Sequence, residues 1–171
     1  MNKRIIQVVS YNPIWPKCFK SEAEQLSVVL GDNLNQIDHI GSTAVPGLSA
    51  KPILDILVAV HRLSELDTLT SEFFALGYEA KGEFGIEGRR YFQKGGNNRT
   101  HHLHAYQKGD EHLTRHIAFR DYLIANNQVA KEYQLIKESA ARKCANDSAI
   151  YQTLKNDFIK KHERIALQQF T

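Results

Sequence analysis

Residues 39–58 read HIGSTAVPGLSAKPILDILV, and this stretch decides the fold of the chain. A turn at Gly41 and Ser42 follows a short predicted strand, and Asp55 comes after twelve intervening residues on an apolar strand. At this spacing, a turn that holds a phosphate can face an acid that binds a metal. A two-metal site for phosphoryl transfer would place a second acid two residues later, on the same strand face, but the chain has Leu57 there.

The bulk composition is that of a globular protein. The 171 residues are 42% apolar and 24% charged, and the net charge of +3 is too small to indicate a nucleic-acid partner. Cys18 and Cys144 stand outside any paired-cysteine motif, which predicts two reduced thiols. The apolar patch near the N-terminus is too short for a signal peptide, and no run approaches a membrane span. We therefore expect a cytoplasmic protein without a membrane partner, and the oligomeric state stays open.

Hydrophobic periodicity predicts strands first and helices last. The first helix ends at Gly31 and begins either at Asn12, capping Pro13, or with Pro16 in its first turn. A helix over 64–76 would be opened by Ser64 with Asp67 as its capping partner. Strands are expected at 4–9, 36–40, 53–60, from 78 onward, at 90–93 within a glycine-rich loop over 81–96, and at 100–106; further helices are expected at 111–126, 128–144 and 149–168.

These elements predict an α+β fold, with a mixed sheet flanked by helices and a C-terminal helical cap. We expect one domain over 1–171, with a strand-rich core at 1–109 and a helical portion at 110–171, because the first part alone would leave its sheet poorly covered. The strand at 53–60 is almost continuously apolar, which predicts burial on both of its faces.

A phosphate-binding site is predicted around the turn. The backbone amides of Gly41, Ser42 and Thr43, with the two hydroxyl groups, can form a small anion cradle, although an ordinary turn is the alternative. Lys51 lies between this turn and the strand of Asp55, and Arg90 begins a strand after a loop that can close over a ligand. Both cations are candidates for neutralising phosphate oxygens.

Asp55 is the candidate catalytic residue. A carboxylate in a buried strand is costly unless a metal, a cation or a hydrogen-bond network compensates it. The structural alternative is a salt bridge from Asp55 to Lys51, Arg89 or Arg90.

His102 and His104 share one face of the strand at 100–106, and Leu103 takes the other. With Asp55 they form a candidate metal site, if the two strands are neighbours. A divalent ion, Mg, Mn or Zn, is the expected cofactor, and imidazole ligands favour zinc or manganese over magnesium. Equally, the histidines can be neutral hydrogen-bond partners or phosphate contacts.

The helical part offers fewer candidates. His112 and His116 lie one turn apart but lack the intervening acid of the zinc-protease pattern, so we assign them to a solvent or packing face. For Arg120 we expect a buried ion pair with an acid.

The stretch His39 to Leu48, followed by Ala50-Lys51-Pro52 and Asp55-Ile56, resembles the signature of the GrpB family. The resemblance extends over nearly the whole chain, through the motifs Trp15-Pro16, Gly77-Tyr78, Arg90-Tyr91-Phe92, His102-Leu103-His104 and Phe119-Arg120-Asp121-Tyr122-Leu123.

This resemblance implies the nucleotidyltransferase-like fold. In active members of that superfamily, a Gly-Ser turn contacts a nucleoside triphosphate and acids hold divalent metals. Gly41 and Ser42 match the turn and Asp55 matches the first acid, whereas Leu57 departs from the second. His102 and His104 are the nearest candidates for the third position. Related domains are fused to dephospho-coenzyme A kinase, which implies a link to nucleotide or coenzyme A metabolism.

Two functions therefore compete. One is a nucleotidyltransferase that acts on a nucleotide or another phosphorylated small molecule through an altered Asp and His metal site. The other is a module that binds a nucleotide or coenzyme A without turnover. The fold alone does not decide between them.

Overall fold

The computed structural model describes residues 5–170. Its centre is a five-stranded mixed sheet with the strand order β1-β2-β5-β4-β3. β2 and β5 run parallel, and the other neighbouring pairs are antiparallel. The strands are β1 (Leu34–Ile40), β2 (Leu54–Val60), β3 (Tyr78–Ala80), β4 (Arg89–Lys94) and β5 (His101–Gln107). The predicted α+β class and the mixed sheet are confirmed.

Five α-helices flank the sheet in residues 5–170, and four lie close to their predicted positions. α1 starts one residue before Pro16, which is the second of the two predicted starts. None of the helices in this part of the chain combines the length and hydrophobicity that a membrane crossing needs. The helices are α1 (Trp15–Leu30), α2 (Thr70–Ala75), α3 (Glu111–Ala125), α4 (Asn127–Lys143) and α5 (Ser148–Phe170), with short 3₁₀ helices η1 (Gly31–Asn33), η2 (Ser42–Ala44) and η3 (Leu63–Thr68).

One face of the sheet has an apolar centre, which α1 and α2 cover. Ile56 and Val58 of β2 and Leu103 of β5 pack there against Leu26 of α1 and Phe73 of α2. Each of these side chains is at most 1% exposed, and burial of such a side chain contributes about 1.5–3 kcal/mol. Because side chains alternate along a strand, the residues between them are left for the opposite face.

The opposite face is divided into an apolar half and a polar half. Leu57, Ile40 and Tyr106 form an apolar cluster beneath Leu113 and Ile117 of α3. The polar half carries Asp55, His102 and His104, which share this face with Leu57 by strand register. The last two helices of the chain pack beside this polar half.

Arg120 fixes α3 to the edge strand. Its guanidinium donates to the Asp38 carboxylate and to the carbonyl of His39, both at 3.1 Å, and to Asp121 at 2.7 Å. The predicted pairing of Arg120 with an acid is confirmed. Of the solvent or packing face expected for the two helix histidines, the packing face is confirmed, since the ring of His112 stacks on Tyr106 and the ring of His116 lies 5.6 Å from that of His104.

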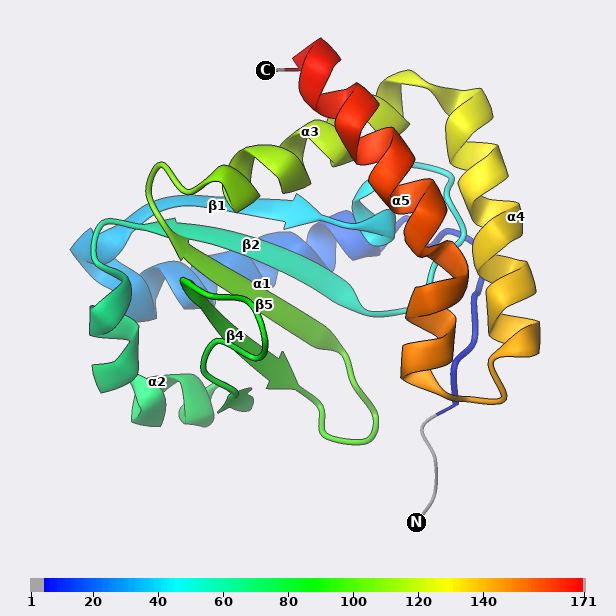
Figure 1. Ribbon diagram of the computed structural model, residues 1–171. Helices are drawn as coiled ribbons and strands as arrows, with labels where there is room; N and C mark the ends of the chain where they lie inside the picture. The colour runs from blue at the N-terminus through cyan, green and yellow to red at the C-terminus, as the bar shows by residue number, and fades with distance from the viewer. Residues whose placement is uncertain (1–4, 171) are drawn as a thin grey trace.

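α4 and α5 stand at the end of the sheet where β1 ends and β2 begins (Figure 1). Tyr133 of α4 and Phe158 of α5 stack with 5.0 Å between ring centroids, in a second apolar cluster that also takes in Val45 and Leu48 of the loop before β2. This packing brings the first half of α5 beside the loop that joins the Gly41 turn to Asp55.

The predicted N-terminal strand is wrong where the structure describes it, and Arg4 lies outside the described residues. Residues 5–8 have no ladder, and Val9 makes a single isolated bridge with Ala50. The bonds run both ways between the Val9 and Ala50 backbones at 2.9 Å. Ile6 of this segment instead packs beside Ala140 of α4 and Cys144, which follows that helix.

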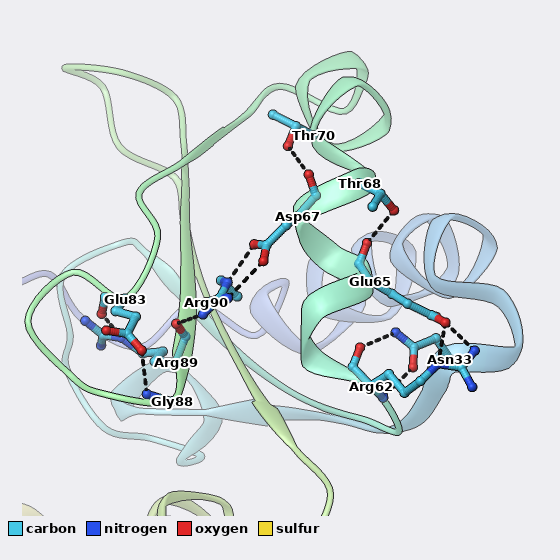
Figure 2. A network of polar contacts seen from close by, with 10 residues as sticks. All are labelled: Asn33, Arg62, Glu65, Asp67, Thr68, Thr70, Glu83, Gly88, Arg89 and Arg90. Carbon is cyan, nitrogen blue, oxygen red and sulfur yellow. Dashed lines mark hydrogen bonds and ion pairs between the residues drawn. The ribbon is translucent and has the colours of Figure 1, made fainter.

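The predicted helix over 64–76 is also wrong, because it divides into η3 and α2. The hydroxyls of Thr68 and Thr70 donate to the carbonyls of Glu65 and Asp67, three residues earlier in each case (Figure 2). Such bonds compete with the α-helical ladder. Asp67 also does not cap Ser64, because its carboxylate binds a guanidinium of the sheet.

Candidate functional site

The turn after β1 is shaped by its closeness to Asp55. Gly41 has φ +71°, in the left-handed region that favours glycine, and a methyl group added there would lie 2.6 Å from the Oδ2 atom of Asp55. Ser42 and Thr43 then turn through η2, closed by a bond from the Ala44 amide to the Gly41 carbonyl at 3.1 Å. The backbone of the predicted turn and the predicted acid are therefore in direct contact.

Asp55 faces the two predicted histidines from the neighbouring strand. Its Oδ1 atom lies 3.0 Å from Nδ1 of His102, within hydrogen-bond distance, and 3.7 Å from Nε2 of His104. Register explains this, since Asp55 is paired with His102 and Leu57 with His104 across the parallel strands. The Asp55 side chain remains 30% exposed, so a ligand can reach it.

Electrostatics favour the ionised form of Asp55. Burial raises the pKa of Asp55, but hydrogen bonds and charge from His102 and His104 outweigh burial, so the net pKa is well below its ordinary value. For His104, burial lowers the pKa, and the nearby Asp55 only partly offsets that effect. The geometry is that of a carboxylate anion held by imidazole.

Lysines converge on this region from three segments. Lys51 of the loop before β2 and Lys155 of α5 place their Nζ atoms 4.6 and 4.7 Å from the centroid of one ring, that of Tyr151. Lys137 of α4 is 2% exposed and donates to the carbonyl of Ser49. Burial, together with repulsion from neighbouring lysines, lowers the pKa of Lys155 to about 8 and that of Lys137 to about 7.

A small pocket of about 90 Å³ opens between the turn and α5. Its volume suits a phosphate-sized group, because sites that enclose a whole drug-sized ligand measure about 300 Å³ or more. The lining residues are Ser42, Thr43, Ala50, Lys51, Ile53, Asp55, His102 and Gln152. The structure therefore brings together most of the predicted site residues, with Gly41 and His104 immediately beside them; whether they act on a ligand stays a prediction.

Arg90 is the predicted site residue that the structure does not bring to this pocket. By register it shares a sheet face with Ala105 and Val58, the face covered by α1 and α2. Its guanidinium binds the Asp67 carboxylate through two bonds of 2.6 and 2.9 Å (Figure 2). The prediction chose the wrong one of two adjacent arginines, because Arg90 points to the face of the sheet opposite Asp55. We therefore leave Arg90 out of the site.

Arg89 takes the place on the polar face. Its Nη1 atom lies 3.5 Å from Nδ1 of His104, and its other nitrogens donate to the carbonyls of Glu83 and Phe84 at 3.1 and 2.8 Å. In Figure 2 the Glu83 side chain closes the same loop through a bond to the Gly88 amide, 2.9 Å long. Arg89 thus organises the glycine-rich loop beside the histidines.

Asp55, His102 and His104 have the donor atoms that one metal ion would need. One carboxylate and two imidazoles are a donor set that suits a single transition metal. Among residues 5–170, however, no three His, Cys, Asp or Glu side chains already stand in a metal-binding arrangement. A second ion does not fit, because Leu57 is 1% exposed inside the apolar cluster under α3.

Two lysines of the region were missed by sequence reasoning. Lys137 and Lys155 sit in the apolar stripes of their helices, four residues after Tyr133 and Tyr151. The sequence signal that could have identified them is a lysine at a position of an amphipathic helix where an apolar, inward-facing residue is expected. Without the tertiary packing of α4 and α5, nothing in the sequence connects either lysine to the Gly41 turn.

The sheet order, the turn after β1 and the acid on β2 are those of the nucleotidyltransferase-like fold. Cid1 in complex with the UTP analog UMPNPP matches this structure with a TM-score of 0.58 at 15% sequence identity, over 86% of this chain and 48% of that chain. At that identity the likeness shows the fold alone.

The chain belongs to the GrpB family, whose model, described as GrpB protein, matches residues 5–164. The crystal structure of conserved protein GrpB from Enterococcus faecalis matches with a TM-score of 0.92 and 43% identity, over 96% of this chain and 99% of that one. The protein YqkA of Bacillus subtilis is 43% identical over 164 residues, which are 96% of this chain. The chain spans about half of YqkA, 48%.

A more distant similarity leads to dephospho-CoA kinase of Mycolicibacterium paratuberculosis. The identity is 26% over 186 residues, which cover 94% of this chain and 46% of the kinase. This chain is thus similar to a segment of that larger protein, which agrees with the fusion that the family resemblance implied.

Proposed function

We propose that this protein binds a nucleotide or another phosphorylated small molecule at the pocket between the Gly41 turn and α5. The observation that carries the proposal is the pocket itself, a phosphate-sized space with Ser42, Thr43 and Lys51 among its lining residues. Hydroxyl and ammonium donors are the groups that proteins use for phosphate oxygens. The nucleotides in the Cid1 complexes and the similarity to dephospho-CoA kinase support this choice of ligand class.

A thermal-shift screen tests the proposal. The panel holds nucleoside mono-, di- and triphosphates, coenzyme A and dephospho-coenzyme A, each with and without divalent metal. At one hundred times its Kd a ligand adds about 2.7 kcal/mol to the unfolding free energy, which raises the Tm of a protein of this size by roughly 5–11 °C. Failure of the whole panel to move the Tm at millimolar concentration would overturn the proposal.

The matched variants are Lys51→Met and Lys160→Met. Lys51 lines the pocket, whereas Lys160 is an exposed lysine of α5 outside it. The first substitution is expected to abolish most of the ligand-induced shift and the second to leave it intact. Equal loss in both variants would show that general charge, and not the pocket, holds the ligand.

Nucleotidyl transfer is the second candidate, and the convergence of Asp55, His102 and His104 favours it. These three side chains are the proposed ligands of one divalent ion, with Asp55 also the proposed catalytic carboxylate. The ion, when bound, would supply charge for a phosphoryl group. A metal titration followed by pyrophosphate release from nucleoside triphosphates tests this candidate, and Asp55→Asn is expected to abolish the release. Ligand binding without any product would instead establish the non-catalytic module.

A further inference from the structure

Phe84 occupies an unusual position on the glycine-rich loop between β3 and β4. Its side chain is 58% exposed, and its φ of +48° lies in the left-handed region that favours glycine. Backbone preference and the hydrophobic effect therefore both disfavour a phenylalanine at this place. Strain of this kind persists only where the surrounding structure enforces it, and it clusters at sites that hold ligands.

Contacts on both sides of Phe84 enforce its conformation. The Arg89 guanidinium donates to the carbonyls of Glu83 and Phe84 at 3.1 and 2.8 Å. The Gly88 amide donates to the Glu83 carboxylate at 2.9 Å and closes the loop (Figure 2). Ile86 packs against the apolar cluster under α3. The loop therefore holds the Phe84 ring in place before a ligand arrives, which lowers the entropy cost of binding.

Phe84 is the exposed end of a row of aromatic rings. Its ring stacks on Tyr91, with 5.1 Å between the centroids and 20° between the planes. The Tyr91 ring in turn lies 5.8 Å from the ring of His102 and 5.1 Å from that of His104. The row thus joins the open Phe84 ring to the polar half of the sheet.

The surroundings of the Phe84 ring fit a small planar ligand. Its exposed neighbours on the loop are Gly82, Glu83, Gly85 and Glu87. A methyl group added to either glycine would meet no atom within 4 Å, so the space beside them is open. A protein partner needs a broader apolar patch than one ring, and the two glutamates disfavour a phosphate. The contact that remains is the stacking of a flat ring, as nucleobases make with aromatic side chains.

We propose that Phe84 and Tyr91 form a stacking site for a nucleobase, which lies flat on the open face of the Phe84 ring. None of the residues that line the phosphate pocket belongs to this loop. The inference goes beyond the proposed function, because it does not require the pocket to bind phosphate. The base belongs either to a free nucleoside or to a nucleotide whose phosphates reach the pocket.

Tryptophan fluorescence reads the stacking directly. The chain has one tryptophan, Trp15, which is 6% exposed, so its emission gives a constant background. Phe84→Trp is expected to lose emission saturably with at least one of adenosine, guanosine, cytidine and uridine, and to be unaffected by ribose 5-phosphate. Phe74→Trp is the matched control, because Phe74 is 75% exposed on α2. Quenching that does not saturate, or equal quenching at both positions, would refute the stacking site.

Titration calorimetry with the nucleoside that quenches most strongly measures the contribution of the ring. Phe84→Gly is expected to weaken its binding at least about fivefold, because stacking on the aromatic side chain is lost. Phe84→Tyr keeps a ring and should retain the affinity, and Phe74→Ala should leave it unchanged. Because glycine accepts a φ of +48° without strain, the Tm of Phe84→Gly is expected to stay near that of the wild type. Unchanged affinity in Phe84→Gly would overturn the proposal.

A comparison of adenosine with ATP identifies the source of the base. Stronger binding of ATP, lost in Lys51→Met, would show that base and phosphates belong to one nucleotide. Equal binding of the two, unchanged in Lys51→Met, would show that the site takes a free nucleoside. Both results support the stacking site.

The same variants separate this inference from the proposed function. Thermal shifts by nucleotides that Lys51→Met abolishes, without quenching in Phe84→Trp, would refute the stacking site and leave the phosphate pocket. Saturable quenching by nucleosides, without any thermal shift that depends on Lys51, would refute the pocket and leave the stacking site.

Discussion

Replacement of Gly41 by alanine should destabilise the protein through contact with Asp55. With φ +71° and ψ −171°, Gly41 lies in a backbone region that is essentially restricted to glycine, where a residue with a Cβ loses roughly 1–3 kcal/mol. The new methyl would also lie 2.6 Å from the Asp55 Oδ2 atom, where ordinary contact begins at 3.4 Å. Such overpacking costs about 1–3 kcal/mol. The free energy of unfolding should therefore fall by about 2–6 kcal/mol, and the Tm by roughly 4–24 °C.

The chain offers a matched control for this substitution. Gly47 has φ +79°, but an added methyl would meet no atom within 4 Å. Gly47→Ala should therefore cost only the conformational part, about 1–2 kcal/mol. Denaturant unfolding of the two variants compares a glycine that contacts Asp55 with one that has no neighbour within 4 Å.

A double-mutant cycle completes the assay. In an Asp55→Ala background the Oδ2 atom is gone, and only the contact between the two Cβ positions, 3.1 Å apart, remains. Gly41→Ala should then cost less than it does in the wild-type background, with a coupling energy above about 1 kcal/mol. Equal costs at Gly41 and Gly47 in the wild-type background would refute the reasoning that Asp55 packs against this turn.

Three further predictions concern residues beside the site. Lys137→Met should raise stability at pH 7. The folded-state pKa of Lys137, about 7, lies below the ordinary 10.5, so the unfolded chain binds more protons between these values. The wild type should therefore gain stability relative to Lys137→Met as pH rises from about 7 to 10.5, and parallel urea-melt profiles across that range would contradict this. Arg90→Ala should leave ligand-induced thermal shifts unchanged and cost less than about 1 kcal/mol, because Asp67 is 52% exposed; a lost shift would return Arg90 to the site. Leu57→Asp should lower the unfolding free energy by more than about 4 kcal/mol, since it buries an unpaired carboxylate in the cluster under α3, and a stable variant would show that this position can hold a second acid.

The sheet and the turn were predictable because they depend on local patterns. The apolar run of β2 predicted burial on both of its faces. The alternation of His102, Leu103 and His104 correctly predicted that the two histidines share one face of the sheet and that Leu103 lies on the other. The sequence predicted that Asp55 lies opposite the histidines only on the condition that their two strands are neighbours. The parallel pairing of β2 with β5 supplies that condition, and it is a long-range feature.

The errors came from information that sequence periodicity does not hold. Arg89 and Arg90 differ by one position, and the register of β4 against β5 decides which of them faces the polar half of the sheet. The threonine hydroxyls at Thr68 and Thr70 ended a helix that apolar spacing had predicted. The position of Lys155 beside Tyr151 depends on how α5 packs at the end of the sheet, and no local motif encodes that packing.

The most direct test of the central claim is a crystal structure grown with a nucleoside triphosphate. The account predicts phosphate density in the pocket beside Ser42, within hydrogen-bond distance of the Lys51 ammonium group. Density at another place, such as the larger open hollow lined by Asn33 and Arg62, would contradict it. So would a structure that stays without nucleotide at a concentration that saturates binding in solution.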